Sequence, residues 1–244
     1  MCQSTEHKPP ADSSHSSLQN IPRHFPERTL LLFDNDLTGE LGHSFGLDIR
    51  NTIYGIRSGK HEYKTGIPQG MTKQEYVEWA MEDIIVSLND NTDIIVSWFA
   101  GAKDCRCPIT SQINYACKKI IERYDFVIFD CEFDLKYLNQ LVDVDIDTTL
   151  IIANPNEESA HLAKRIEEFS AKYAAGGQLG VVVNKADNSN MSKVSEILKK
   201  YDLDVLGVIP YDEDIEIITR SSKKIQNAID EFYFRLNLPQ GEVH

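Results

Sequence analysis

The chain has 244 residues and a formal net charge of -13, with 41% hydrophobic and 26% charged residues. A chain this acidic repels the phosphates of DNA and RNA, so we expect no nucleic-acid partner. No stretch reaches the roughly 18 apolar residues of a membrane-spanning helix, and the polar N-terminus lacks the apolar segment of a secretory signal, which predicts a cytoplasmic protein without membrane insertion.

Residues 1–28 are rich in Ser, Pro, His and charged residues and are predicted to form a disordered leader. One domain is expected over residues 29–238, followed by a short tail at 239–244. The predicted elements, in chain order, are a strand at Thr29–Asp34, a helix at 73–88, a strand at Asp93–Trp98, a helix at 109–121, strands at Asp125–Asp130 and Thr148–Ala153, a helix at 157–174, a strand at Leu179–Asn184, a helix at 191–200, a strand at Asp204–Ile209 and a helix at 221–236.

The pattern of these elements indicates the fold class. Runs of five or six apolar residues are typical of strands that are buried on both faces. Strands that alternate with amphipathic helices predict a parallel sheet covered by helices on both faces. We therefore expect an α/β fold with a mostly parallel sheet.

Polar and acidic residues follow four of the predicted strands. Ligands of open parallel sheets bind at the carboxyl ends of the strands, where these residues should gather. An acidic edge of this kind suits Mg²⁺ and an oriented water, although each acid alone could be the N-cap of the next helix. The residues concerned are Asp34 and Asp36, Asp130, Asn184 to Asp187, and Pro210.

The segment Asn184–Asp187 reads Asn-Lys-Ala-Asp. This matches the Asn-Lys-x-Asp pattern with which GTPases recognise guanine. In ATPases of the same broad class an Asn at this strand end contacts adenine, so the motif leaves the choice between ATP and GTP open. Turn chemistry without any ligand is the third reading.

Two of the five cysteines, Cys105 and Cys107, are separated by one residue and precede Pro108 and an apolar helix. The odd number of cysteines argues against a disulfide framework. Two thiolates in an extended loop at a helix N-terminus can bind a soft metal such as Zn²⁺, with a partner subunit supplying the remaining ligands. The alternative is a pair of unreactive thiols.

The chain resembles the CooC-type ATPases, which are MinD/ParA-like proteins associated with nickel insertion into carbon monoxide dehydrogenase. The resemblance covers roughly residues 29–236. It rests on the Cys-x-Cys-Pro motif ahead of a helix, on the opening LLLFDNDLTGELGHSFGL, on YDFVIFDCEFDLKYL and on LDVLGVIPYDEDI.

This resemblance implies roles for individual residues. Asp36 would orient the attacking water or respond to the γ-phosphate, and Asp130 would hold Mg²⁺ as the Walker B acid. Asp34 would lie in the nucleotide site beside them. Asn184 and Pro210 would flank the adenine of ATP, with Asp187 in the same loop. Cys105 and Cys107 would bind Ni²⁺ or Zn²⁺ across a homodimer, or across a heterodimer with a homologue.

The sequence departs from the family at its phosphate-binding part. No G-x-x-x-x-G-K-[ST] loop occurs in the 244 residues, and Asp134 replaces the glycine that senses the γ-phosphate. In the family the strand before this loop lies mid-sheet, so its loss would leave two interior edges unpaired. Either the chain is a degenerate paralogue whose sheet closes over the gap or borrows a strand, or, as we favour, the sequence start is misplaced.

Three functions follow. The first is a CooC/MinD-like ATPase, or its remnant without the loop, that serves nickel maturation of a carbon monoxide dehydrogenase-type enzyme by ATP-linked dimer switching. The second is a non-catalytic pseudo-ATPase that dimerises or docks on a partner. The third, prompted by Asn184–Asp187 alone, is a GTP-binding accessory protein.

Overall fold

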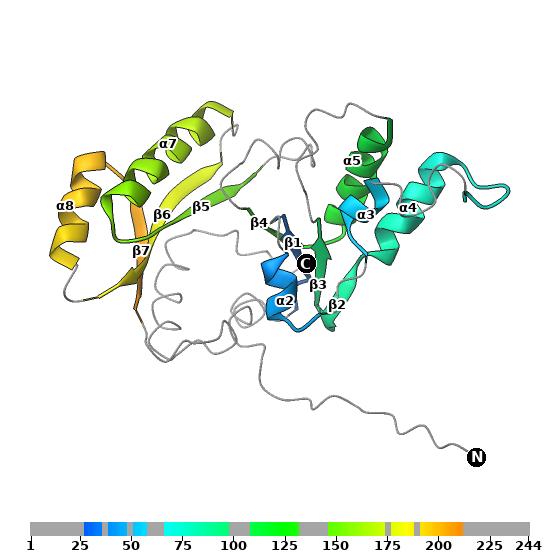
Figure 1. The fold of residues 1–244 in the computed structure, drawn as a ribbon, viewed down its shortest axis with the longest axis horizontal. Helices are drawn as coiled ribbons and strands as arrows, with labels where there is room; N and C mark the ends of the chain where they lie inside the picture. The colour runs from blue at the N-terminus through cyan, green and yellow to red at the C-terminus, as the bar shows by residue number, and fades with distance from the viewer. Residues whose placement is uncertain are drawn as a thin grey trace, which may run out of the picture.

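The structure, a computed structural model, describes residues 27–35, 39–47, 51–57, 66–97, 108–131, 146–173, 177–187 and 191–211. In these residues strands are interspersed with helices, as the sequence predicts, and the strands form two groups, each mostly parallel and each flanked by helices (Figure 1). The predicted leader, the tail and the helix expected at 221–236 lie outside the described residues.

The first group is a four-stranded sheet in the order β2-β3-β1-β4. Its strands are β1 (Leu30–Asp34), β2 (Val86–Asn89), β3 (Thr92–Val96) and β4 (Phe126–Asp130). β1 pairs in parallel with both β3 and β4 over its whole length. All five residues of β1 are buried, which is why this strand is an uninterrupted apolar run.

The second group is a three-stranded parallel sheet in the order β5-β6-β7. It consists of β5 (Thr148–Ala153), β6 (Gln178–Ala186) and β7 (Val205–Pro210). The central strand β6 buries Val181, Val182 and Val183 almost completely. The six strands expected from the sequence are therefore present, and their ends differ from the expected ones by at most two residues.

Helices cover both faces of the four-stranded sheet. Alternate residues of β1, Leu31 and Phe33, pack in one core with residues from α3 (Ile53–Arg57), α4 (Lys73–Asp83) and α5 (Pro108–Ile121). Leu30 and Leu32 point to the opposite face, where the segment containing α2 (Glu40–Ser44) packs. On the three-stranded sheet α7 (Glu157–Tyr173) packs against β5 and β6, and Val194 of α8 (Met191–Tyr201) packs with Val183 of β6.

Helix α4 begins with the capping box that the sequence predicts. The Thr72 hydroxyl accepts a hydrogen bond from the Glu75 N–H at 3.2 Å, and the Glu75 carboxylate accepts one from the Thr72 N–H at 2.7 Å. This second bond lowers the pKa of Glu75. The two residues thus satisfy N–H groups that a helix start leaves without partners.

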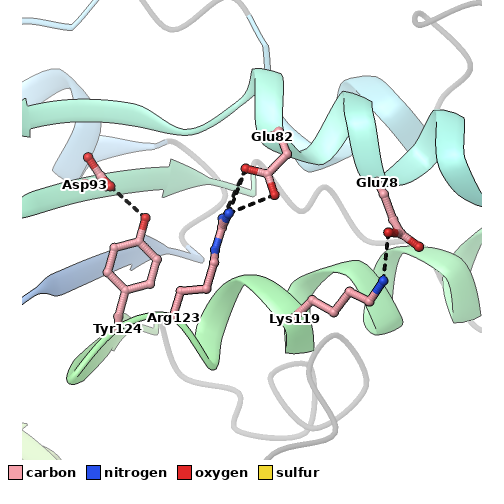
Figure 2. A network of polar contacts seen from close by, with 6 residues as sticks. All are labelled: Glu78, Glu82, Asp93, Lys119, Arg123 and Tyr124. Atoms are coloured by element: carbon pink, nitrogen blue, oxygen red, sulfur yellow. Dashed lines mark hydrogen bonds and ion pairs between the residues drawn. The ribbon is translucent and has the colours of Figure 1, made fainter.

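Polar side chains join α4, α5 and β3 (Figure 2). The Glu78 carboxylate accepts from Lys119 at 2.9 Å, and that of Glu82 accepts from the Arg123 guanidinium at 3.1 Å. The Tyr124 hydroxyl donates to Asp93 at 2.7 Å. Burial, together with this hydrogen bond, raises the pKa of Tyr124.

One sequence expectation is wrong. The helix predicted over 73–88 ends at Asp83, and Val86–Asn89 forms strand β2, antiparallel to β3. Its burial alternates between half-buried and exposed residues, the period of two that marks a strand with one covered face. In the described part of the chain no helix is long and apolar enough to cross a membrane.

Candidate functional site

The carboxyl ends of β1 and β4 bring two predicted site residues together. Asp34 and Asp130 are register partners on these neighbouring strands. The chain continues the pairing one step further, because the Asn35 N–H donates to the Asp130 carbonyl at 2.9 Å. Asp34 is fully buried whereas Asp130 is exposed, so only Asp130 can meet a ligand from solvent without rearrangement.

Asp34 has a partner within the fold. Its Oδ2 accepts a hydrogen bond from the Gly42 N–H, in the first turn of helix α2, at 3.0 Å. The N-cap residue of this helix is Gly39, with φ 66° and no side chain that could cap it. The Asp34 carboxylate therefore takes the place of the missing cap, because it accepts a hydrogen bond from an N–H of the first turn and places a negative charge at the helix N-terminus.

Three neighbouring side chains complete this edge. The Ser97 hydroxyl, at the end of β3, donates to Asn35 Oδ1 at 2.9 Å, and the Ser97 N–H donates to the Asp34 carbonyl at 2.8 Å. Cys131 directly follows Asp130, and burial raises its pKa to about 11. The thiol is therefore protonated at neutral pH and is a weak nucleophile.

Ser97 was missed by the sequence reasoning, which considered the polar residues after four of the six predicted strands. The same rule that selected Asp34 and Asp130 also applies to the end of the run Asp93–Trp98. Applied there, it finds a buried hydroxyl at the same edge.

The ends of β6 and β7 form the second part of the candidate site. Ala186 is the register partner of Pro210, and the Tyr211 N–H donates to the Ala186 carbonyl at 2.8 Å. This pairing places the Asn184–Asp187 segment beside Pro210, as the predicted base-binding role of both requires. Lys185 has a positive φ of 58°, and its N–H donates to Asn184 Oδ1 at 3.0 Å. Non-glycine residues in this conformation are uncommon and are enriched at functional sites.

The remaining predicted site residues, Asp36, Cys105 and Cys107, lie outside the described residues, as does Asp134. Within the described ranges no group of three or more His, Cys, Asp or Glu side chains is arranged to hold a metal ion.

Comparison with solved structures decides the fold. The MinD cell division protein of Aquifex aeolicus superposes with a TM-score of 0.59 at 16% identity, over 95% of this chain and 97% of that chain. The chain has the fold of MinD. A ParA family ATPase of Chlorobium tepidum also superposes with a TM-score of 0.59, at 15% identity, over 87% of each chain.

One curated relative shares sequence over most of its length. It is described as an uncharacterized ATP-binding protein of Methanocaldococcus jannaschii, MJ0685, and is 24% identical over 190 residues. The alignment covers 77% of this chain and 75% of that protein. No protein-family model matches the chain.

Proposed function

We propose that this chain is an ATP-dependent switch protein of the MinD/ParA type that serves the maturation of a metallocentre. The observation that carries the proposal is the arrangement of its strand ends. Asp130 is exposed beside Asp34 at the end of β4, and Asn184–Asp187 lie beside Pro210 at the ends of β6 and β7. The relative described as ATP-binding supports ATP as the nucleotide.

MgATP has three parts to be bound: the metal ion, the base and the phosphates. The residues of this edge fit the metal ion and the base. Exposed carboxylates bind Mg²⁺ directly or through water, and Asp130 presents one at a strand end. Asn184 and Pro210 would hold the base, with Asp187 in the same turn. When bound, MgATP would supply a transferable phosphoryl group. It would also shift the protein between two conformations if it bound one of them more tightly than the other.

The phosphates are the part without a fit. The lysine and the glycine-rich backbone that cradle a triphosphate have no counterpart in the 244 residues. The carboxylates of Asp34 and Asp130 would repel phosphate unless cations offset them. This deficit favours a second candidate function, a non-catalytic module that keeps the fold and binds a partner.

The metallocentre part of the proposal rests on Cys105 and Cys107. They lie three residues and one residue before helix α5, which begins at Pro108. A helix N-terminus stabilises thiolates, and two such pairs from a homodimer or from a heterodimer with a homologue provide the four ligands that Zn²⁺ prefers. The CooC-type resemblance suggests Ni²⁺ as the cargo and a carbon monoxide dehydrogenase-type enzyme as the client.

Calorimetric titration with MgATP tests the nucleotide proposal. We expect saturable binding that requires Mg²⁺, is weakened by Asp130→Asn, and exceeds the binding of GTP. Asp125→Asn is the matched control, because Asp125 lies just before the opposite end of β4. Absence of any binding would leave the non-catalytic module, and a preference for GTP would overturn the choice of base.

Metal analysis tests the second part. The purified wild-type chain and the double variant Cys105→Ser/Cys107→Ser are loaded with Ni²⁺ or Zn²⁺ and desalted. We expect about one metal ion per two wild-type chains, the stoichiometry of a shared four-ligand site. Equal metal content in both proteins would exclude these cysteines as ligands.

A further inference from the structure

The ends of strands β3, β1 and β4 are joined by a single residue. These strands lie side by side (Figure 1), and Asn35 directly follows the middle one. Its Oδ1 accepts a hydrogen bond from the Ser97 hydroxyl, just past the end of β3, at 2.9 Å. Its N–H donates to the Asp130 carbonyl, at the end of β4, at 2.9 Å. Asn35 therefore contacts both neighbours of β1 at the edge where the acidic pair lies.

The Asn35 side chain also contacts the residue that follows β4. Burial raises the pKa of the Cys131 thiol to about 11, and a side-chain hydrogen bond with Asn35 opposes this rise. An amide accepts through its oxygen and donates through its nitrogen, so one asparagine can bond both Ser97 and Cys131. The regular pairing of β1 with β4 stops at Asp34 and Asp130. The amide thus extends the connection between the strands beyond their last paired residues.

Ser97 is a fixed anchor for this bridge. Its side chain is fully buried. Its N–H donates to the Asp34 carbonyl at 2.8 Å, and its carbonyl accepts from the Tyr54 N–H at 2.9 Å. A buried polar network whose members all have partners is rigid. The Ser97 hydroxyl therefore holds the Asn35 amide in one orientation.

The Asp130 carboxylate differs from the residues around it. Its side chain is exposed, whereas Asn35 beside it and Cys131 after it are half-buried. The direction of an exposed side chain at the end of a strand depends on how firmly the backbone that carries it is held. A metal ligand that is held by hydrogen-bonded neighbours binds its metal more tightly, because its orientation is set before the metal arrives.

We propose that Asn35 is a positioning residue for the metal ligand Asp130. Its amide ties Cys131 to the buried Ser97, and this bridge fixes the backbone from which the Asp130 carboxylate projects. Any residue at position 35 except proline could donate its N–H to the Asp130 carbonyl, but the bridge needs an amide side chain. The inference rests on the Mg²⁺-binding role proposed for Asp130 and requires neither ATP nor the two cysteines ahead of α5.

Mn²⁺ is the probe for this inference. It takes the same oxygen ligands as Mg²⁺, and it is paramagnetic, so it broadens the nuclear magnetic resonance signals of nearby amides. The full chain, labelled with ¹⁵N, is titrated with Mn²⁺ alone, so that the result does not depend on nucleotide binding. We expect saturable broadening of the Asp130 and Cys131 amide signals in the wild type, and its loss in Asp130→Asn.

Variants of the bridge then test its effect on metal affinity. Asn35→Ala keeps the N–H that bonds Asp130 and removes the amide that bonds Ser97 and Cys131. We expect its Mn²⁺ affinity to fall about tenfold, as is typical when a group that orients a metal ligand is removed. Cys131→Ser keeps a hydrogen-bonding group and should retain the wild-type affinity, whereas Cys131→Ala should lose as much as Asn35→Ala. Because both alanine variants remove one contact, combining them should cause no further loss.

Asn89→Ala is the matched control, since Asn89 ends β2 of the same sheet but pairs with the first residue of β3, at the opposite edge. Urea unfolding of every variant separates positioning from stability. A lower free energy of unfolding in Asn35→Ala with unchanged Mn²⁺ affinity would mean a structural role alone and would overturn the proposal. Equal loss in Asn89→Ala, or absence of broadening at Asp130 in the wild type, would overturn it as well. The expected Mn²⁺ results together with absence of MgATP binding would support this inference and refute the nucleotide proposal.

Discussion

Replacing Asp34 with alanine tests whether this buried carboxylate holds helix α2 against the sheet. Its Oδ2 accepts the Gly42 N–H at 3.0 Å, and Gly42 is itself buried. The substitution leaves that N–H without its acceptor, and an unsatisfied buried donor costs about 1–3 kcal/mol. We therefore expect the free energy of unfolding to fall by about 1–3 kcal/mol.

Urea unfolding followed by circular dichroism measures this loss, provided that the slope of the transition is unchanged. Asp34→Asn keeps an oxygen that can accept the Gly42 N–H, so it should lose less than Asp34→Ala. Asp130→Ala is the control at the same register position, where an exposed side chain should change stability by about 0.5 kcal/mol or less. Equal losses for Asp34→Ala and Asp130→Ala would refute the structural role of Asp34.

Three further outcomes are expected. Thr72→Ala removes the hydroxyl cap of α4 and should lower the unfolding free energy by about 1 kcal/mol in the same urea assay. With a pKa of about 11, Cys131 should react with iodoacetamide at pH 8 far more slowly than free glutathione, as followed by mass spectrometry. Hydrogen bonds, first among them the one from the Thr29 N–H, lower the pKa of Asp125 below its unfolded value near 3.9. The contribution of Asp125 to stability is therefore present above that pH and is lost as the pH falls through the folded pKa. In Asp125→Asn the free energy of unfolding, measured as a function of pH, should fall less steeply over this acidic range.

The parallel strands could be predicted because each is a continuous apolar run. Such a run is recognisable without partners, since both faces of the strand are covered. That Asp34 and Asp130 gather at one edge then followed from the rule that ligand-binding residues lie at the carboxyl ends of parallel strands. The confirmed elements are those whose signal is local in the sequence.

Strand β2 and the burial of Asp34 could not be predicted in this way. Val86–Asn89 continues the apolar residues of α4, and only pairing with β3 beyond the turn at Asp90 decides in favour of a strand. Asp34 resembles Asp130 in sequence, because each ends an apolar run of the same length. They differ in their surroundings, because β1 is paired on both sides, with β3 and with β4, and the Gly42 N–H of α2 contacts the Asp34 carboxylate.

The break between the two sheets also divides the candidate site. Asp34 and Asp130 end strands on one side of the break, and Asn184 and Pro210 end strands on the other. The acidic pair depends on the β1–β4 pairing, and the predicted base-binding segment depends on the β6–β7 pairing. A substitution that disturbs one of these pairings should therefore alter one part of the candidate site and leave the other in place.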